Sequence, residues 1–178
     1  MIEGMSTGDI SRRGQSTVDG DTATLIFKRV MPHAAERVWE AIATAEGLGE
    51  WLMCTDVRID GRPGGTIEMV SGPGRYHSTG TILNWDPPHL FEYEWNVAPV
   101  PEMPLGEHAI FRYELTPQQG STLLTVIYRR VTKPTASGFL PGLHALLDRL
   151  EAQLDERPLP DWHSRFNELL SQYPALIK

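Results

Sequence analysis

Cysteine is nearly absent from this chain. Cys54 stands alone among 178 residues, so no disulfide can form within the protein. A single thiol fits a reducing compartment, and we expect a cytoplasmic location. Positive charge is also scarce, because 16 Lys and Arg face 23 Asp and Glu and the net charge is -7. A nucleic-acid partner, which requires a basic face, is therefore not expected.

Long apolar runs are missing as well. No stretch approaches the roughly 18 residues that a membrane-spanning helix needs, so we expect no membrane span. The first residues, Met1 to Asp21, are polar and lack the apolar core of a signal peptide. Both absences favour a protein that folds in water.

Motifs that would assign a chemistry directly are absent too. The six histidines show no HExxH or other compact zinc spacing, so we expect no metal site and no cofactor. No serine lies in a GxSxG motif, and the stretch 71–74 has neither a P-loop lysine nor a following helix. Cys54 has no activating partner in the sequence and is interpreted as a small buried hydrophobic residue.

Three regions are expected along the chain. Residues 1–21 are rich in Gly, Ser, Thr and Asp and predict a disordered polar tail. Residues 22–157 form the expected domain, since a chain of this length and 40% hydrophobic content can build one core. Residues 158–178 predict a helical extension, with Asp161 as the N-cap of a last helix through Leu170.

Closely spaced strands make up most of the expected domain. Pro32 marks the start of a short helix through Ile42, which Gly47 and Gly49 should separate from a second short turn. Segments of alternating hydrophobicity, separated by Gly and Pro, predict an antiparallel meander. The strands are expected over residues 22–30, 55–60, 66–70, 76–85, 90–95, 109–115 and 122–130.

A long helix over residues 136–154 is expected to cover this sheet. Its leucines recur at helical spacing and form one apolar stripe, with Pro141 placed in the first turn. The later strands alternate between aromatic residues on one face and charged residues on the other. The polar face carries Glu68, Glu92, Glu94 and Glu114, which we expect to be solvated and partly paired with Arg112 and Arg129.

Side chains between the sheet and the long helix are the candidates for ligand binding. Their rings could line a pocket and offer Tyr or Trp as polar handles; equally, any one of them could simply fill the core. His144 is the candidate general base or ligand hydrogen-bond partner, and a solvent-facing or satisfied histidine is the plainer alternative. The candidate set is Met69, Phe91, Tyr93, Trp95, Phe111, Tyr113, Tyr128, Leu143, His144 and Leu147.

The segment 97–106 stands apart from the other connections. It holds three prolines and several large apolar side chains between two predicted strands. Long loops of this kind are often functional. A lid over a pocket mouth, part of a dimer contact and a plain proline-stiffened connection are the three interpretations it allows.

The ordered set of these features resembles a known superfamily. Pro32 to Trp39 leads into a helix, Trp51 follows, and the stretch 62–66 places a glycine pair before a strand. Strands over 80–83 and 90–95, and the terminal helix from Gly138, complete the pattern. Together they resemble the helix-grip superfamily of START domains and polyketide cyclases. Within it, the chain looks most like the activator of heat-shock-protein-90 ATPase homologue-1-like family, over about residues 22–155.

The resemblance implies an α+β helix-grip fold, in which a curved antiparallel sheet wraps around a long C-terminal helix and two short helices follow the first strand. It also implies a cavity for a small hydrophobic or amphipathic ligand. A cyclase- or aromatase-like enzyme and a co-chaperone-like interaction module are the alternatives. Chaperone activation is not carried over, because the eukaryotic namesake acts in a multidomain context. The extra C-terminal helix and the apolar loop predict a homodimer.

Overall fold

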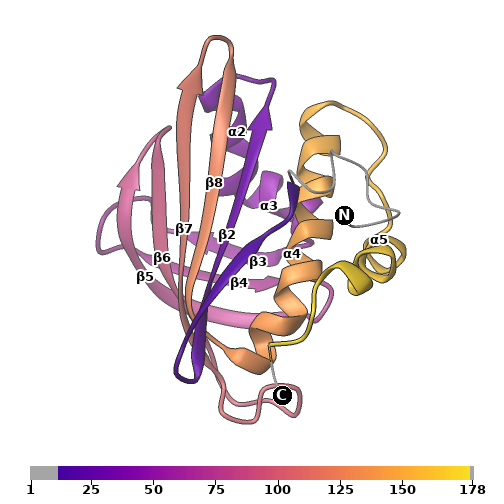
Figure 1. The fold of residues 1–178 in the computed structure, drawn as a ribbon. Helices are drawn as coiled ribbons and strands as arrows, with labels where there is room; N and C mark the ends of the chain where they lie inside the picture. Colours follow the sequence, from indigo (N-terminus) through magenta and orange to yellow (C-terminus); the bar gives the residue numbers. More distant parts are fainter. Residues whose placement is uncertain (1–11, 177–178) are drawn as a thin grey trace.

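The structure, a computed structural model, describes residues 12–176 (Figure 1). Its centre is one curved antiparallel sheet of eight strands in the order β1-β2-β8-β7-β6-β5-β4-β3. The strands are β1 (Gln15–Asp19), β2 (Thr22–Met31), β3 (Thr55–Ile59), β4 (Thr66–Ser71), β5 (Tyr76–Asp86), β6 (Leu90–Val97), β7 (Glu107–Gln118) and β8 (Ser121–Thr132). The helices are α2 (Ala35–Ala43), α3 (Ala45–Trp51), α4 (Lys133–Leu154), α5 (Trp162–Leu169) and the 3-10 turn η1 (Leu170–Gln172). The predicted helix-grip architecture is confirmed, including the two short helices after the strand that opens the domain.

Strand register places the aromatic residues in a row across the sheet. Tyr93 of β6 lies opposite Phe111 of β7, and Phe111 lies opposite Tyr128 of β8. Directly opposed residues point to the same face of an antiparallel pair, so the three rings are neighbours on the inner face. Helix α4 crosses this face (Figure 1), and the core forms between them.

Helix α4 is longer at its start than the sequence predicts. It begins at Lys133, and Pro134 occupies the first turn, where its missing N–H is not needed. Pro141 therefore lies inside the helix and not in its first turn. The predicted helix start was wrong because Pro141 was interpreted as the proline of the first turn, whereas Pro134 has that place.

The glycines after α2 have a packing role. They were expected to end the helix, but Gly47 and Gly49 both lie within α3, which Thr44 caps by accepting a hydrogen bond from the Gly47 N–H (3.1 Å). A Cβ atom at Gly47 would lie 2.3 Å from the carbonyl oxygen of Glu40. Glycine is therefore required there because α2 and α3 approach closely.

Strand β1 corrects the expected disordered tail. Residues Gln15–Asp19 pair antiparallel with β2, and Gly20 at φ 62° makes the turn between the two strands. All five residues of β1 are exposed, so the strand is held by its backbone hydrogen bonds to β2 and not by buried side chains. Its sequence accordingly shows no apolar alternation from which a strand could be predicted. The remainder of that predicted tail, residues 1–11, lies outside the described part of the chain.

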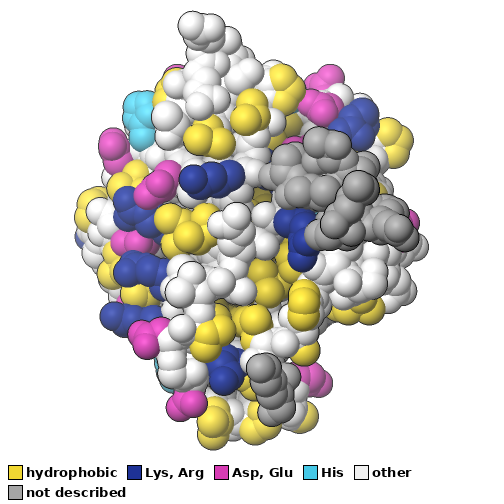
Figure 2. Space-filling view, in the orientation of Figure 1, with side chains coloured by type: hydrophobic (Ala, Val, Ile, Leu, Met, Phe, Trp, Pro, Cys, Tyr) yellow, Lys and Arg dark blue, Asp and Glu magenta, His cyan; other side chains and the backbone are white. Residues whose placement is uncertain are grey.

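One outer-face carboxylate is less solvated than predicted. Glu92 is buried and accepts hydrogen bonds from Arg129 (2.9 Å) and Asn84 (2.8 Å). Arg112 bridges Glu92 (3.3 Å) and Glu114 (2.6 Å). The expected pairing is confirmed, and it shields Glu92 from water. In the space-filling view, Lys and Arg side chains lie beside Asp and Glu along one side of the molecule (Figure 2).

Helix α5 packs within the same domain. The Asp161 carboxylate accepts a hydrogen bond from the Ser164 N–H (3.0 Å), so the predicted N-cap is confirmed. The helix lies against α4 on the side away from most of the sheet (Figure 1). Among the helices of residues 12–176, none is both long and apolar enough to cross a membrane.

Candidate functional site

A cavity of about 480 Å³ lies between the inner face of the sheet and α4. The sheet forms its floor, α4 forms one side, and the β4–β5 turn, the 97–106 loop and α5 complete the wall. Apolar and aromatic side chains predominate. The lining includes Leu52, Met69, Tyr76, Tyr93, Trp95, Met103, Phe111, Tyr128, Phe139, Leu143, Leu146, Trp162 and Phe166.

The structure brings only part of the predicted site set to this cavity. Met69, Tyr93, Trp95, Phe111, Tyr128 and Leu143 line it. Phe91, Tyr113, His144 and Leu147 are buried elsewhere. Phe91 packs on Trp39 and Trp85, with ring centroids 5.9 and 5.1 Å away. Leu147 lies one helical turn beyond Leu143 and is fully buried in the core.

The floor of the cavity is a stack of aromatic rings. The Phe111 and Tyr128 rings are nearly parallel, at 7°, with centroids 3.5 Å apart. Trp95 stacks on Phe111 at 4.9 Å and 19°. Phe111 and Tyr128 are directly opposed in the strand register, and Trp95, which lies opposite Ala109, is diagonal to Phe111. Three neighbouring strands therefore present one continuous apolar surface.

Tyrosine hydroxyl groups supply the polar contacts below this floor. The hydroxyl oxygens of Tyr113 and Tyr128 are 2.5 Å apart. Burial raises the pKa of Tyr93, Tyr113 and Tyr128 above the usual value, because the phenolate would be poorly solvated there. The three groups stay protonated at neutral pH. They can donate hydrogen bonds, and they do not act as bases.

We expect each of the five tyrosines to ionise above the usual pKa of about 10 in the folded protein. Burial also raises the pKa of Tyr76, and it raises that of Tyr173 to about 12. The pKa of each tyrosine is higher in the folded than in the unfolded protein. The contribution of these protonated tyrosines to the free energy of unfolding is therefore fully present below a pH of about 10, and it is lost as the pH rises through the folded-state pKa values. A spectrophotometric titration of tyrosinate in native and denaturing buffer measures the shift. A tyrosine that ionises normally before unfolding would contradict the described burial.

The 97–106 loop covers part of the cavity. Val100 and Met103 exchange backbone hydrogen bonds of 3.0 and 2.9 Å, and the Met103 side chain is buried against the cavity. Gly106 has φ 69°, and a Cβ there would lie 2.4 Å from the Val97 carbonyl oxygen. Glycine therefore lets the loop close back on itself. This geometry matches the lid interpretation of the loop.

Helix α5 contributes cavity residues that the sequence argument missed. Trp162 and Phe166 stack at 4.6 Å and line the cavity, and His163 lies beside them. The Trp162 indole N–H donates to the Gly142 carbonyl oxygen (3.1 Å). A signal was present: Gly138 and Gly142 lie four apart on α4 and leave a bare strip that an aromatic helix can approach.

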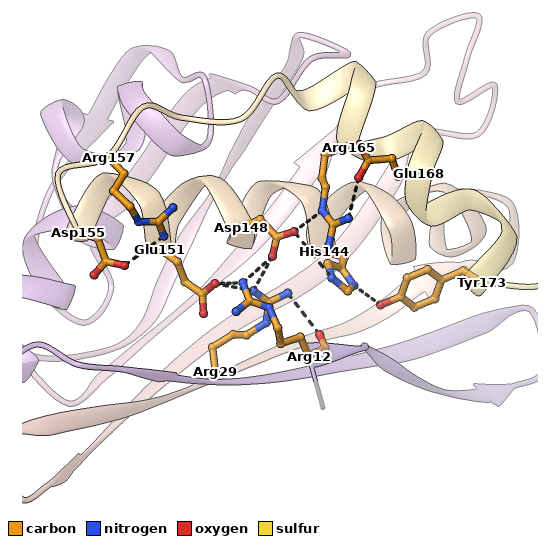
Figure 3. Close-up of polar contacts among 10 residues, drawn as sticks. All are labelled: Arg12, Arg29, His144, Asp148, Glu151, Asp155, Arg157, Arg165, Glu168 and Tyr173. Carbon is orange, nitrogen blue, oxygen red and sulfur yellow. Dashed lines mark hydrogen bonds and ion pairs between the residues drawn. The ribbon is translucent and has the colours of Figure 1, made fainter. Parts of the chain in front are cut away.

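His144 does not face the cavity. It is fully buried on the opposite side of α4, where its Nδ1 lies 2.7 Å from the hydroxyl oxygen of Tyr173. Its Nε2 lies 3.8 Å from Asp148 Oδ2 (Figure 3). His144 was a candidate general base or ligand partner, but its side chain belongs to a polar cluster that α4 separates from the cavity, as in the plainer alternative of a satisfied histidine.

Comparison with known proteins agrees with this architecture. The sequence model described as "Activator of Hsp90 ATPase homolog 1-like protein" matches residues 32–155, more than half of the chain. The chain belongs to this family. A search of curated proteins finds no match.

Several solved structures share the family fold. Protein MLL2253 from Mesorhizobium loti is 22% identical, with 76% of this chain and 99% of that chain covered and a TM-score of 0.65. CalU16 from Micromonospora echinospora is 19% identical, with 92% and 94% covered and a TM-score of 0.67. The protein encoded by BPP1335 from Bordetella parapertussis is 21% identical, with 89% and 87% covered and a TM-score of 0.67. At these identities the similarity shows the fold.

The polar cluster on the side of α4 that faces away from the cavity is centred on Asp148. Its carboxylate contacts Arg29 and Arg12 (both 2.9 Å) and Arg165 (2.7 Å) (Figure 3). Burial alone would raise the pKa of Asp148, but these arginines and His144 outweigh it and the pKa is lowered. Burial lowers the pKa of Arg29 to about 10, against the attraction of Asp148. Both groups are charged at neutral pH.

Neither a metal site nor a reactive thiol is found among the residues that the structure describes. Within residues 12–176, no three His, Cys, Asp or Glu side chains gather to hold a metal ion. Burial raises the pKa of Cys54 to about 12, and its Sγ lies 3.7 Å from Met69 Sδ. The thiol therefore packs as an apolar group, as predicted.

Proposed function

We propose that this protein binds a small hydrophobic or amphipathic molecule in the cavity between the sheet and α4. The observation that carries the proposal is the cavity itself, about 480 Å³ and lined mainly by aromatic and aliphatic side chains. Ligand pockets typically enclose about 300–1,000 Å³ and combine an apolar lining with a few polar groups. Burial of the ligand's apolar surface supplies the driving force.

The polar groups at the wall would orient such a ligand. Ser71 and Tyr76 line the cavity, and the hydroxyl group of each can donate a hydrogen bond. The hydroxyl groups of Tyr93 and Tyr128 interact with that of Tyr113 below the floor, so these two residues present mainly their rings to a ligand. A carbonyl or hydroxyl on the ligand could accept from Ser71 or Tyr76.

Titration with a neutral fluorescent dye, Nile red, tests the proposal. We expect saturable binding at one site, with the blue-shifted emission of a dye in an apolar environment. Unlabelled apolar competitors should displace the dye. Emission that stays at its value in water, or that rises without saturation, would count against a binding cavity.

The alternatives have less support. A cyclase-like reaction loses its assigned base, because His144 faces the polar cluster. The interaction-module alternative keeps its prediction of a retained protein partner, and a pull-down without one would count against it. Activation of a chaperone ATPase is not proposed for this chain.

Homodimerisation and a cytoplasmic location stay predictions. The dimer was expected from helix α5 and the apolar 97–106 loop: α5 packs on α4 and Met103 of the loop is buried in this domain, whereas Leu105 of the loop is exposed. Light scattering decides the point: twice the chain mass supports a dimer, and a single chain mass contradicts it. Cell fractionation with a labelled chain tests the location, and recovery outside the cytoplasm would contradict it.

A further inference from the structure

The cavity wall holds a carboxylate and no lysine or arginine among its described lining residues. That carboxylate belongs to Glu102. His163, exposed on α5, is the other lining residue that can carry charge. Nearby Arg75 turns away and hydrogen-bonds the Met53 carbonyl oxygen and the Thr55 hydroxyl group. An anionic ligand group would therefore lose water without gaining a lysine or arginine partner, which is costly.

Aromatic rings cluster beside that carboxylate. The rings of Tyr76, Trp95 and Phe139 lie with centroids 5.7–6.5 Å apart, and all three line the cavity. Burial, and then the charge of Glu102, raises the pKa of Tyr76, which places the carboxylate near this cluster. Aromatic faces attract cations through the ring quadrupole, and most strongly when the cation is shielded from water.

We propose that the cavity prefers apolar molecules that end in an ammonium group. The apolar body would lie on the stacked rings of the floor, and the cation would lie at the ring cluster near Glu102. This inference rests on the proposed binding function and names the chemical class of its ligand. It excludes fatty acids and other carboxylates as preferred ligands.

Three probes that share the naphthalene ring and differ in the charge of the end group test the preference. They are naphthylmethyl trimethylammonium, naphthylmethanol and naphthoate, each titrated by calorimetry. We expect the ammonium probe to bind about fivefold more tightly than the alcohol, a cation–π effect of ordinary size. Naphthoate should bind most weakly. An alcohol that binds as tightly as the ammonium probe, or a preference for naphthoate, would overturn the inference while leaving the binding function intact.

Two variants locate the preference in the named residues. Glu102→Gln removes the carboxylate, and Phe139→Leu keeps an apolar side chain while it removes a ring. Each should lower the ammonium-to-alcohol affinity ratio by about twofold to threefold. The effect of Glu102→Gln is modest because Glu102 is exposed and its charge is partly screened, and Phe139→Leu removes one of the rings that attract the cation. Glu36→Gln removes an exposed carboxylate outside the cavity and should leave the ratio unchanged. A ratio that neither cavity variant changes would refute the assignment, and failure of every probe and of Nile red would refute the binding function as well.

Discussion

Replacing Asp148 by alanine is expected to lower the free energy of unfolding by about 3 kcal/mol. The Arg29 side chain is 1% exposed and would keep its charge after its nearest carboxylate is gone. Glu151, 3.4 Å from Arg29, compensates in part, so the effect should lie at the low end for a broken buried ion pair. Urea unfolding followed by circular dichroism measures the change.

An exposed ion pair provides the control for that variant. Glu156 lies 3.7 Å from Arg37, and its side chain is 82% exposed. Glu156→Ala should cost less than about 1 kcal/mol. Equal costs for the two variants would show that the Asp148 cluster does not hold the N-terminal segment, α4 and α5 together.

The Asp148 effect should also depend on pH. The pKa of this carboxyl is lowered in the folded protein, so its stabilisation is present above the unfolded pKa of about 3.9 and is lost as the pH falls through the folded value. The difference in stability between the wild type and Asp148→Ala should therefore shrink in acid. A difference that stays constant down to acid unfolding would contradict the lowered pKa.

Filling the cavity is expected to abolish ligand binding. Leu143→Trp adds an indole to a wall residue of the cavity, so Nile red affinity should fall at least about tenfold while the protein stays folded. Leu147→Trp makes the same change one turn along α4, where the site is packed and fully buried. It should cost about 1–3 kcal/mol of stability by overpacking, with dye affinity preserved in the folded fraction.

The two tryptophan variants together separate a cavity from a solid core. Equal loss of stability in both, with unchanged dye binding in Leu143→Trp, would mean that the dye does not enter between the sheet and α4. Thermal unfolding gives the stability difference, and dye titration gives the binding difference. The wild-type protein and Leu147→Trp serve as the references for affinity.

Much of this fold could be predicted because each face of β6, β7 and β8 has its own chemistry. Alternation alone places Tyr93, Phe111 and Tyr128 on the inner side, and the register then aligns them. The stripe of leucines on α4 likewise predicts a covering helix. Periodicity cannot tell which part of that stripe meets a cavity, so Leu143 and Leu147 look equivalent in the sequence and differ in the structure.

The remaining features depend on distant parts of the chain. The His144 side chain contacts Tyr173, which lies 29 residues away, and no local sequence pattern predicts that pair. The exposed strand β1 has no apolar alternation to reveal it. The aromatic wall from α5 follows from how Trp162 approaches Gly142. Each of these is a tertiary contact, and the sequence gives only the residue types that make it possible.

Isotope-filtered nuclear Overhauser spectroscopy on a methyl-labelled protein with bound Nile red tests the central claim most directly. If the cavity is the binding site, dye protons should show contacts with methyl groups of Met69, Met103, Leu143 and Leu146, which line it. Methyl groups of Leu25, Leu147 and Leu150, buried in the solid core, should show none. Contacts confined to surface methyl groups, such as those of Leu105 or Leu170, would contradict an internal ligand site.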